Sequence, residues 1–559
     1  MSAAHPQPLS PRGGERVAAG RLRRGALLAI SAVWLLSTAL WLQPGVIKPD
    51  GAGYLVYLPS AWLDGDLLFY NEWQRLGMVA RDGTTMFRGT SASDHLGIHW
   101  AAGAAVAWLP PFIAADAARA IAPPLQRFPR NGVSLPYNVA IVAMSAAAGL
   151  ATLLIGFVIA RRFTAEGAAA GACIAVWLGT PLLWYSVRHA TLSHAVSGAA
   201  CALFVLLALR LRNAMTTEAV FSVGLALGFA AAVRVQNVAL APVVLIVLEP
   251  AARREVLRRA HWLIAGGLLG VLPEVIASQV LYGSPIAFAG FGARVTLGVF
   301  RRFWFSETLF SWFHGAFPWT PLVALAVCGL LLVLRSDRRL AIAGLYAFLI
   351  QWLLNATLER AFWSGVSFGN RRFDSCTIFF IIGLAALLAR FPRSGAAAAA
   401  LCCAWTMALF FAAGRLDLNF DQTPSELIAA MGPPKLAPLA FVPPAAKAHV
   451  AALAVFTLLL IFAIAALLRR ARPHVRAAIA ATYLGAVSLF FAVCGVRDGS
   501  RKALYRDLIE KNRAQLGQTL SDIGLLRAEE RYLRRQGKEE AADVTAAEAA
   551  RLEEAVRGR

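Results

Sequence analysis

The stretch YNVAIVAMSAAAGLATLLIGFVIA, residues 137–160, decides the fold class of this chain. It contains no charged residue, and Arg161 and Arg162 follow it directly. About 20 apolar residues in a helix cross a hydrocarbon core of roughly 30 Å. In lipid, the backbone N–H and C=O groups have to bond within the segment, which makes such a run α-helical. The stretch therefore predicts a transmembrane helix.

Runs of this kind recur over most of the 559 residues, and the composition agrees with them. Hydrophobic residues make up 58% of the chain and charged residues 15%, against about 45–50% and 25% in a soluble domain. The net charge of +22 is spread as short Arg clusters between the apolar runs, which is the pattern that orients membrane helices. We therefore predict an all-α polytopic membrane protein that is surrounded by membrane lipids and has no nucleic-acid partner.

The Arg clusters also predict how the chain is threaded. Assigning all of them to the cytoplasm gives about thirteen spans, with the N-terminus on the cytoplasmic side of a bacterial inner membrane. The run 101–120 is ambiguous, because as a span it would put Arg161 and Arg162 outside, and it contains two adjacent prolines and Asp116. We place it as a helix along the outer face. The expected spans are 25–43, 137–160, 166–185, 195–212, 217–235, 237–250, 262–282, 320–334, 339–356, 373–389, 395–414, 448–468 and 475–495.

This threading divides the chain into three parts. Residues 1–24 form a cytoplasmic tail, and residues 25–495 form a transmembrane domain in which residues 44–136 are one long external loop after an uncleaved first helix. Residues 496–559 differ in composition, with 14 Lys/Arg against 12 Asp/Glu and leucines at near-helical spacing. They are predicted to form an amphipathic helical appendage. An odd number of spans places this tail outside, and one miscounted helix reverses that.

Unusual polar residues gather in the long external loop. Asp50 follows the first span within a few residues and lies beside Gly51 and Gly53. A carboxylate at the water–lipid boundary is partly desolvated, which can raise its basicity. The alternatives are a solvated or helix-capping carboxylate and, for Tyr54 and the other aromatic residues, an interfacial belt. Further candidates in the loop are Asp94, His95 and His99.

Several motifs occur in a definite order along residues 25–390. A first helix is followed by a large external loop that opens with an acidic residue, Asp50 in KPDGAGY. Further motifs are GTPLLWYSVRHATLSHAVS (179–197), AVRVQN (232–237), YGSP (282–285), FHGAFPWTP (313–321) and FWSGVSFGNRRF (362–373). In these features the chain resembles the GT-C class of membrane glycosyltransferases, which includes protein O-mannosyltransferases, the lipid A aminoarabinose transferase and uncharacterised bacterial relatives.

The resemblance implies a glycosyltransferase in which Asp50 is the base toward the acceptor. It places Asp94 and His95 near the family's second polar cluster, where they and His99 would help to bind the acceptor or an optional divalent metal. Many relatives carry two adjacent acidic residues at the first site, whereas Gly51 follows Asp50 here, so we assign no metal ligand. The 7 cysteines lie in or beside apolar runs without a C-x-x-C pair, and they indicate neither a zinc site nor a disulfide framework.

A set of arginines is expected outside or at outer helix ends, against the positive-inside bias. Arg binds phosphate oxygens through two parallel hydrogen bonds. Arg371 and Arg372 are the first choice for holding a phosphate, and an ion pair with a nearby carboxylate such as Asp374 is the alternative. His194, at an outer helix end, is expected to bind substrate or to be a hydrogen-bonded structural histidine. The set is Arg188, Arg234, Arg301, Arg302, Arg360, Arg371 and Arg372.

The predicted donor follows from the side of the membrane. Nucleotide sugars are not supplied outside, so the sugar has to arrive on a lipid carrier, and a polyprenyl phosphate fits because its phosphate lies at the outer interface. The acceptor can be a glycan, a lipid or a protein, and the sugar and the stereochemistry stay open. The alternatives are a secondary transporter or lipid flippase, which Glu274 and Arg234 favour, and a non-catalytic scaffold with the same fold.

Overall fold

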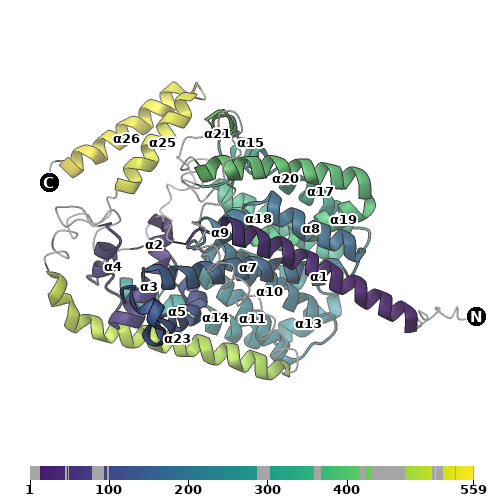
Figure 1. Ribbon diagram of the computed structural model, residues 1–559, viewed down its shortest axis with the longest axis horizontal. Coiled ribbons are helices and arrows are strands. Elements are labelled where there is room, and N and C mark those ends of the chain that lie inside the picture. Colours follow the sequence, from purple (N-terminus) through teal and green to yellow (C-terminus); the bar gives the residue numbers. More distant parts are fainter. Residues whose placement is uncertain are drawn as a thin grey trace, which may run out of the picture.

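The computed structural model describes residues 13–44, 47, 49–78, 93–96, 98, 100–285, 303–357, 367–415, 423–430, 472–506, 510, 520–535 and 537–557. Within these ranges the regular elements are all helices. The long helices α1 (Gly13–Trp41), α20 (Pro392–Arg415) and α23 (Pro473–Arg501) run roughly along the long axis of the molecule, at the outside of a helix bundle (Figure 1).

Eight helices in the described ranges are long and apolar enough to cross a membrane, and the number rises to 9 if α8 (Glu166–Gly179) and α9 (Pro181–Val187), bent by 66° at their break, form one span. The prediction of an all-α polytopic membrane protein is thereby confirmed, while the count of about thirteen spans stays a prediction. The 8 segments are Arg24–Trp41, Gly103–Ile121, Leu135–Ala160, Ala260–Tyr282, Arg338–Thr357, Arg371–Arg390, Pro392–Gly414 and Pro473–Gly499.

Other expected spans correspond to shorter segments. Three of them are the apolar helices α10 (His194–Arg210), α11 (Thr217–Val233) and α17 (Leu322–Val333). The expected span 237–250 corresponds to the shorter apolar segment Val235–Ile246. It consists of the 3-10 helix η2 (Val235–Leu240) and the short α12 (Val243–Ile246), which meet at Pro242, a residue without a backbone N–H. The expected span 448–468 lies outside the described residues.

The ambiguous run forms helix α5 (Gly103–Ile121), which has the length and hydropathy of a span. It packs on α7 (Leu135–Ala160). Its carboxylate, Asp116, accepts hydrogen bonds from Tyr137 Oη at 2.6 Å and Arg130 Nη2 at 2.8 Å. These partners explain how an apolar helix carries an acidic residue. Its placement along the outer face stays a prediction.

Close backbone packing positions the segment that carries Arg234. Helix α11 packs against α14 (Ala260–Tyr282) through small residues. A Cβ added at Gly228 would lie 2.0 Å from the carbonyl oxygen of Gly267, so only glycine permits this approach. Arg234 directly follows the end of α11, and the rigid α11–α14 pair therefore fixes its backbone.

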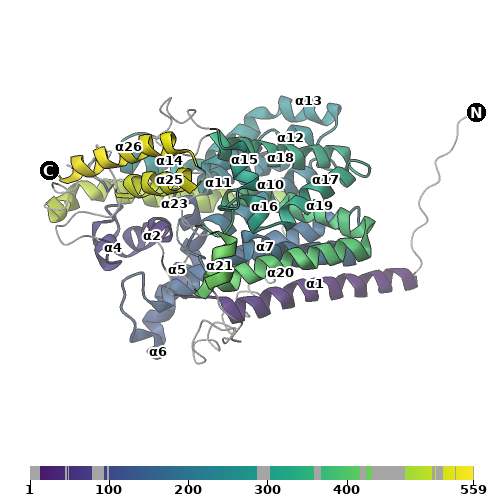
Figure 2. The ribbon, with the colours of Figure 1, turned by 90° about the horizontal axis from the view of Figure 1, so that it is seen from above.

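The two ends of the bundle differ in what they carry. The first-loop helices α2 (Pro49–Leu55) and α4 (Tyr70–Arg75) lie at the end opposite to the start of α1 (Figures 1 and 2). Helix α13 (Pro250–Arg258), which holds one of the Arg clusters, lies at the end where α1 begins. The fold thus separates the first loop from this basic cluster along the axis of the bundle.

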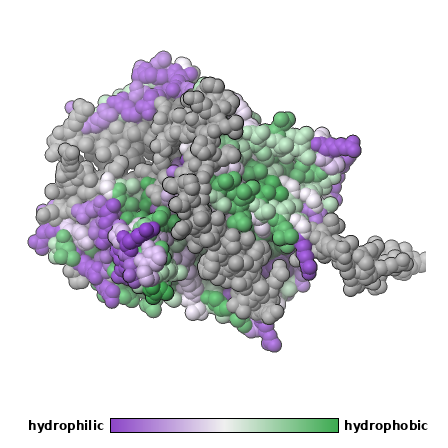
Figure 3. All heavy atoms as spheres, in the orientation of Figure 1, coloured by the Kyte–Doolittle hydropathy of each residue, from purple (hydrophilic) through white to green (hydrophobic). Residues whose placement is uncertain are grey.

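The tail forms a helical hairpin of α25 (Leu520–Arg535) and α26 (Glu539–Arg557). Leu526, Leu533 and Ala549 are buried in it. Hydrophilic side chains cover the outside of the hairpin, whereas hydrophobic side chains gather on the surface of the helix bundle (Figure 3). The described part of the tail is thus helical, as the leucine spacing predicts, and its side of the membrane stays a prediction.

Helix α23 continues to Arg501, beyond residue 495, where the last span was expected to end. Its last turns carry Asp498 and Arg501, which contact the first loop. Part of the segment assigned to the tail is therefore an extension of an apolar helix.

Candidate active site

The first turn of α2 positions Asp50. A Cβ added at Gly51 would lie 2.1 Å from Thr191 Oγ1, and one added at Gly53 would lie 2.0 Å from the ring of Trp100. The two glycines therefore serve close packing of α2 rather than flexibility. The contact at Gly51 also explains why no second acidic residue follows Asp50, since a longer side chain would collide with Thr191.

Asp50 forms an ion pair with Arg371, in which Arg371 Nη2 donates to Asp50 Oδ2 at 2.8 Å. Arg371 begins the 3-10 helix η4 (Arg371–Cys376), which leads directly into α19 (Thr377–Arg390). The Asp50 side chain is 37% exposed and the Arg371 side chain 12%. The structure therefore joins the predicted base to the predicted phosphate ligand, and the pairing of Arg371 with Asp374 that the sequence offered as the alternative is not the one formed.

Asp374 belongs instead to a second group, with His194 and Arg234. Asp374 Oδ2 lies 3.1 Å from His194 Nδ1 and 3.6 Å from Arg234 Nε. In the tautomer with a proton on Nδ1, His194 donates to this carboxylate, and Arg234 Nη1 lies 3.3 Å from the same Nδ1. The ring of Tyr185 lies 4.5 Å from the ring of His194 and fixes its other side.

A pocket lies between α9, α10, α17, η4 and α19, next to both groups. Its lining combines polar side chains, among them Tyr185, His194, Arg371 and Asp374, with apolar ones that include Leu182, Val323 and Phe380. An arginine and a histidine among apolar side chains suit an amphiphilic ligand with a charged head. The arrangement offers a cation for an anion, and the carboxylate of Asp50 beside that cation.

The other predicted cations are placed in part. Arg188 is buried, donates to the carbonyl of Gly414 at 2.8 Å and lies over the ring of Trp184. The backbone carbonyl of Arg372 accepts from Gln236 Nε2 at 3.0 Å. Arg301, Arg302, Arg360 and His99 lie outside the described residues.

Tyr54, on α2, is close to the charged groups of the pocket. Burial raises the pKa of Tyr54, and the neighbouring Arg234 and Arg371 act in the opposite direction. The phenol therefore stays protonated at neutral pH and is able to donate a hydrogen bond. This keeps Tyr54 a candidate for contact with substrate.

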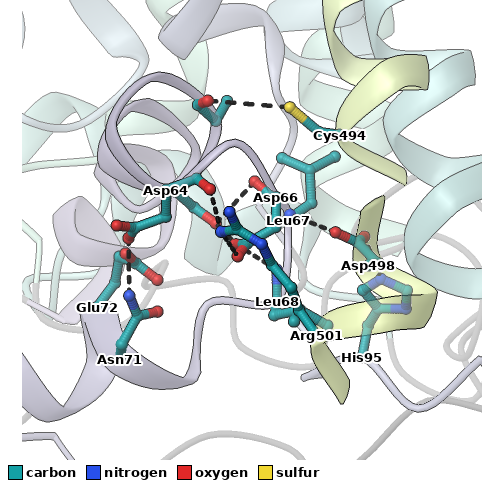
Figure 4. Close-up of polar contacts among 12 residues, drawn as sticks. Asp64, Asp66, Leu67, Leu68, Asn71, Glu72, His95, Cys494, Asp498 and Arg501 are labelled. Atoms are coloured by element: carbon teal, nitrogen blue, oxygen red, sulfur yellow. Dashed lines mark hydrogen bonds and ion pairs between the residues drawn. The ribbon is translucent and has the colours of Figure 1, made fainter. Parts of the chain in front are cut away.

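Asp94 and His95 lie at a different place, shown in part in Figure 4. Asp94 has a left-handed backbone (φ 60°), and its carbonyl accepts from Tyr70 Oη at 3.4 Å. His95 Nε2 lies 2.7 Å from Asp498 Oδ2 of α23. The other oxygen of Asp498 accepts from the backbone N–H of Leu67 at 3.1 Å. His95 thus ties the first loop to the last apolar helix.

Three further loop carboxylates lie on one side of this contact (Figure 4). Asp66 accepts from Arg501 Nη1 at 3.0 Å. Burial raises the pKa of Glu72 well above its usual range, and the adjacent Asp64 adds to this. Burial also acts to raise the pKa of Asp64, but hydrogen bonds from Glu72 and Asn71 and the charge of Arg75 outweigh it and hold this pKa low. We call the set Asp64, Asp66, Glu72, His95, Asp498 and Arg501 the loop–helix junction.

The described side chains beside the pocket do not form a donor set for a metal ion. In the ranges that the structure describes, no group of three or more His, Cys, Asp or Glu side chains is arranged to hold one. The two carboxylates beside the pocket, Asp50 and Asp374, are already bound to Arg371 and Arg234. We therefore propose no catalytic role for the optional metal ion.

Sequence reasoning missed or misjudged three residues. Asp374 was considered only as a partner for Arg371. Glu274 accepts from the backbone N–H of Ala102 at 2.6 Å, at the start of α5, and so has a structural role. His314 is buried, has φ 57° and stacks on Trp319, and burial lowers its pKa to about 3. A histidine next to a glycine in FHGAFPWTP was the only signal for it.

No protein-family model matches the chain, and neither does any curated protein. Among solved structures, the chain is similar to the crystal structure of ArnT from Cupriavidus metallidurans in the apo state, with 16% identity and a TM-score of 0.44 over 89% of this chain and 78% of that one. It is also similar to the cryo-EM structure of the arabinosyltransferase EmbB from Mycobacterium smegmatis, with 13% identity and a TM-score of 0.32 over 89% of this chain and 43% of that one. Similarities at this level assign no activity to the chain.

Proposed function

We propose that this protein is a membrane glycosyltransferase that moves a sugar from a polyprenyl-phosphate-linked donor to an acceptor at the external face of a bacterial inner membrane. The observation that carries the proposal is the Asp50–Arg371 pair at 2.8 Å, with Arg371 in the lining of a pocket that contains both polar and apolar side chains. The proposed base and the proposed ligand of the phosphate thus lie side by side.

The cations of the pocket would hold the donor phosphate. Arg371 presents a planar guanidinium that matches two phosphate oxygens, which a lysine cannot do. Arg234 is the second guanidinium of this group and lies beside His194. Positive charge fixed at the leaving oxygen stabilises the transition state, where negative charge develops on the phosphate. The apolar side chains of the lining, Leu182, Val323 and Phe380, would contact the part of the lipid chain next to the phosphate.

Asp50 would take the proton of the acceptor. The acceptor oxygen forms a bond to the anomeric carbon of the sugar while the bond from that carbon to the phosphate oxygen breaks. The electron pair leaves with the polyprenyl phosphate, and the hydroxyl proton moves to the carboxylate. With 37% of its side chain exposed, Asp50 is within reach of a hydroxyl that approaches from outside the pocket.

The decisive assay uses the purified full chain and a panel of synthetic short-chain polyprenyl-phosphate sugars. We expect release of polyprenyl phosphate together with transfer of the sugar to one acceptor class among glycans, lipids and peptides. Glycolipid profiling of a deletion strain identifies the donor independently, because the unused lipid-linked sugar accumulates. If no donor reacts while proteoliposomes move a lipid or a solute, the transporter or flippase interpretation replaces this one.

The external location is tested separately by reporters that are active only outside the cytoplasm. A reporter fused after residue 90 should be active, and one fused after residue 256, in the basic α13, should be silent. Equal activity at the two positions would contradict the threading and, with it, the external active site.

A further inference from the structure

Two groups would contact the guanidinium of Arg371, the carboxylate of Asp50 and the donor phosphate. In the structure its Nη2 donates to Asp50 Oδ2. The proposed function, on which this inference rests, also assigns Arg371 to the donor phosphate. A phosphate held by the planar fork uses two parallel N–H groups, so a phosphate that takes the side of the guanidinium now facing Asp50 competes with this carboxylate.

The charges beside the pocket indicate which ion pair is broken when a phosphate binds. Two carboxylates, Asp50 and Asp374, balance two guanidiniums, Arg371 and Arg234. A phosphate adds negative charge to this group, which weakens the contact between a carboxylate and the guanidinium that it shares with the phosphate. Asp374 is only 9% exposed and is held by His194, Arg234 and the backbone N–H of Ser375. Asp50 is the more exposed of the two, and an exposed ion pair is held weakly.

We propose that Arg371 holds Asp50 until the donor phosphate displaces it, so that binding of the donor frees the base. A carboxylate next to a guanidinium is a weaker base than one without it, because the cation stabilises the ionised form. When the phosphate takes the guanidinium, this stabilisation ends and a negative charge comes close to the carboxylate. Both changes increase the proton affinity of the base after the donor has bound. The acceptor hydroxyl is therefore activated only in the presence of a donor, and the two substrates bind in order.

The test measures the donor dissociation constant without acceptor. If Asp50 competes with the phosphate, Asp50→Asn should tighten donor binding by about three- to tenfold, since a partly exposed pair contributes little more than a surface one. The same variant should lose turnover, so affinity and rate move in opposite directions. Asp64→Asn is the matched control, because Asp64 lies in the loop–helix junction with Asn71 and Arg75; donor affinity should stay within about twofold of wild type, as for a distant independent site.

A double-mutant cycle separates displacement from simple charge repulsion. In an Arg371→Gln background, Asp50→Asn should change donor affinity by less than about twofold, because the contested side chain is gone. Repulsion alone predicts that the tightening persists there, and this result would overturn the proposal. If Arg371→Gln does not fold, Arg371→Lys gives the same cycle with a smaller coupling, and an undiminished effect of Asp50→Asn in it counts against displacement.

The remaining outcomes are also distinct. A wild-type protein that binds no polyprenyl-phosphate sugar would remove the proposed function itself. A wild-type protein that binds and transfers the sugar, together with an Asp50→Asn variant that binds the donor equally or more weakly, would leave the function standing and refute the displacement of Asp50.

Discussion

Two sets of ion pairs connect the first loop to segments hundreds of residues away, and they differ in exposure. At the pocket, Asp50 pairs with Arg371 and keeps 37% of its side chain exposed. At the loop–helix junction, Asp66 and Asp498 pair with Arg501 and His95 and are 2% and 1% exposed. The residue types are similar, but of these three carboxylates Asp50 has by far the largest exposed fraction, which the proposed displacement by a substrate requires.

The carboxylates of the loop–helix junction also accept hydrogen bonds from backbone N–H groups. Asp66 also accepts from Ser60 Oγ at 2.9 Å and from the backbone N–H of Leu68 at 3.3 Å. Asp498 accepts from the backbone of Leu67. Carboxylates that satisfy buried backbone groups hold the fold in place, since those groups lose a partner if the acid is removed. Burial and hydrogen bonds to the backbone, rather than the presence of an ion pair, therefore distinguish Asp66 and Asp498 from Asp50.

The largest difference between the two regions should appear in turnover. Asp50→Asn preserves the size of the side chain but removes the base, which contributes about 10²–10⁴-fold. We expect turnover in the transfer assay to fall by about that factor while thermal stability and membrane insertion stay near wild type. Asp66→Asn changes the same chemistry in the junction and should alter turnover per folded molecule by less than about threefold.

The reverse ranking would break the comparison. If Asp50→Asn turns over like wild type, the base lies elsewhere, and Asp94 is the next candidate in the loop. If Asp66→Asn loses as much turnover as Asp50→Asn without loss of stability, the junction takes part in catalysis in spite of its burial.

The sequence predicted the class of fold and singled out Asp50 and Arg371, but it did not predict that these two residues pair. Apolar runs and Arg clusters are local features of the sequence, so they predict helices but not how the helices pack. The contact of Asp50 with Arg371 spans 321 residues, and that of His95 with Asp498 spans 403. Such pairs depend on how helices pack.

Sequence spacing was misleading where it suggested a local pair. Arg371 and Asp374 lie three residues apart, which favours contact on a helix. In the structure, Asp374 faces His194 of α10 instead, while Arg371 faces the first loop. Conversely, the run of basic and acidic residues after 495 was assigned to the tail, although α23 continues through it to Arg501.

The second effect, on stability, should come from the junction. Asp498→Ala leaves His95 Nε2 and the N–H of Leu67 without their acceptor. Each buried group left unpaired is worth about 1–3 kcal/mol, so we expect a loss of about 2–5 kcal/mol of unfolding free energy, read as a lower thermal midpoint in detergent. Turnover per folded molecule should change by less than about threefold.

Asp498→Asn serves as the matched variant, because its amide oxygen still accepts one of the two hydrogen bonds. It should lose less stability than Asp498→Ala. An Asp498→Ala protein with the thermal midpoint of wild type would show that the contact between α23 and the first loop does not hold the loop in place.

The smallest effect concerns Glu72 and depends on pH. Burial raises the pKa of Glu72 well above the usual 4.5. The unfolded chain therefore loses this proton near pH 4.5, whereas the folded protein keeps it to higher pH. Between these values the folded state binds more protons, so the free energy of unfolding falls as the pH rises. Glu72→Gln cannot ionise and still donates to Asp64, so it avoids that loss.

We therefore expect the thermal midpoint of Glu72→Gln to match that of wild type near pH 4.5 and to exceed it increasingly as the pH rises, until the folded pKa is passed. Glu540→Gln, on the exposed side of α26, is the control and should show no such trend. The turnover of Glu72→Gln should stay near wild type at every pH, because Glu72 lies in the loop–helix junction. A midpoint difference that does not grow with pH would mean that Glu72 is ionised in the folded protein. In that case the junction would carry one more buried charge, and the contrast with the open Asp50 pair would rest on exposure alone.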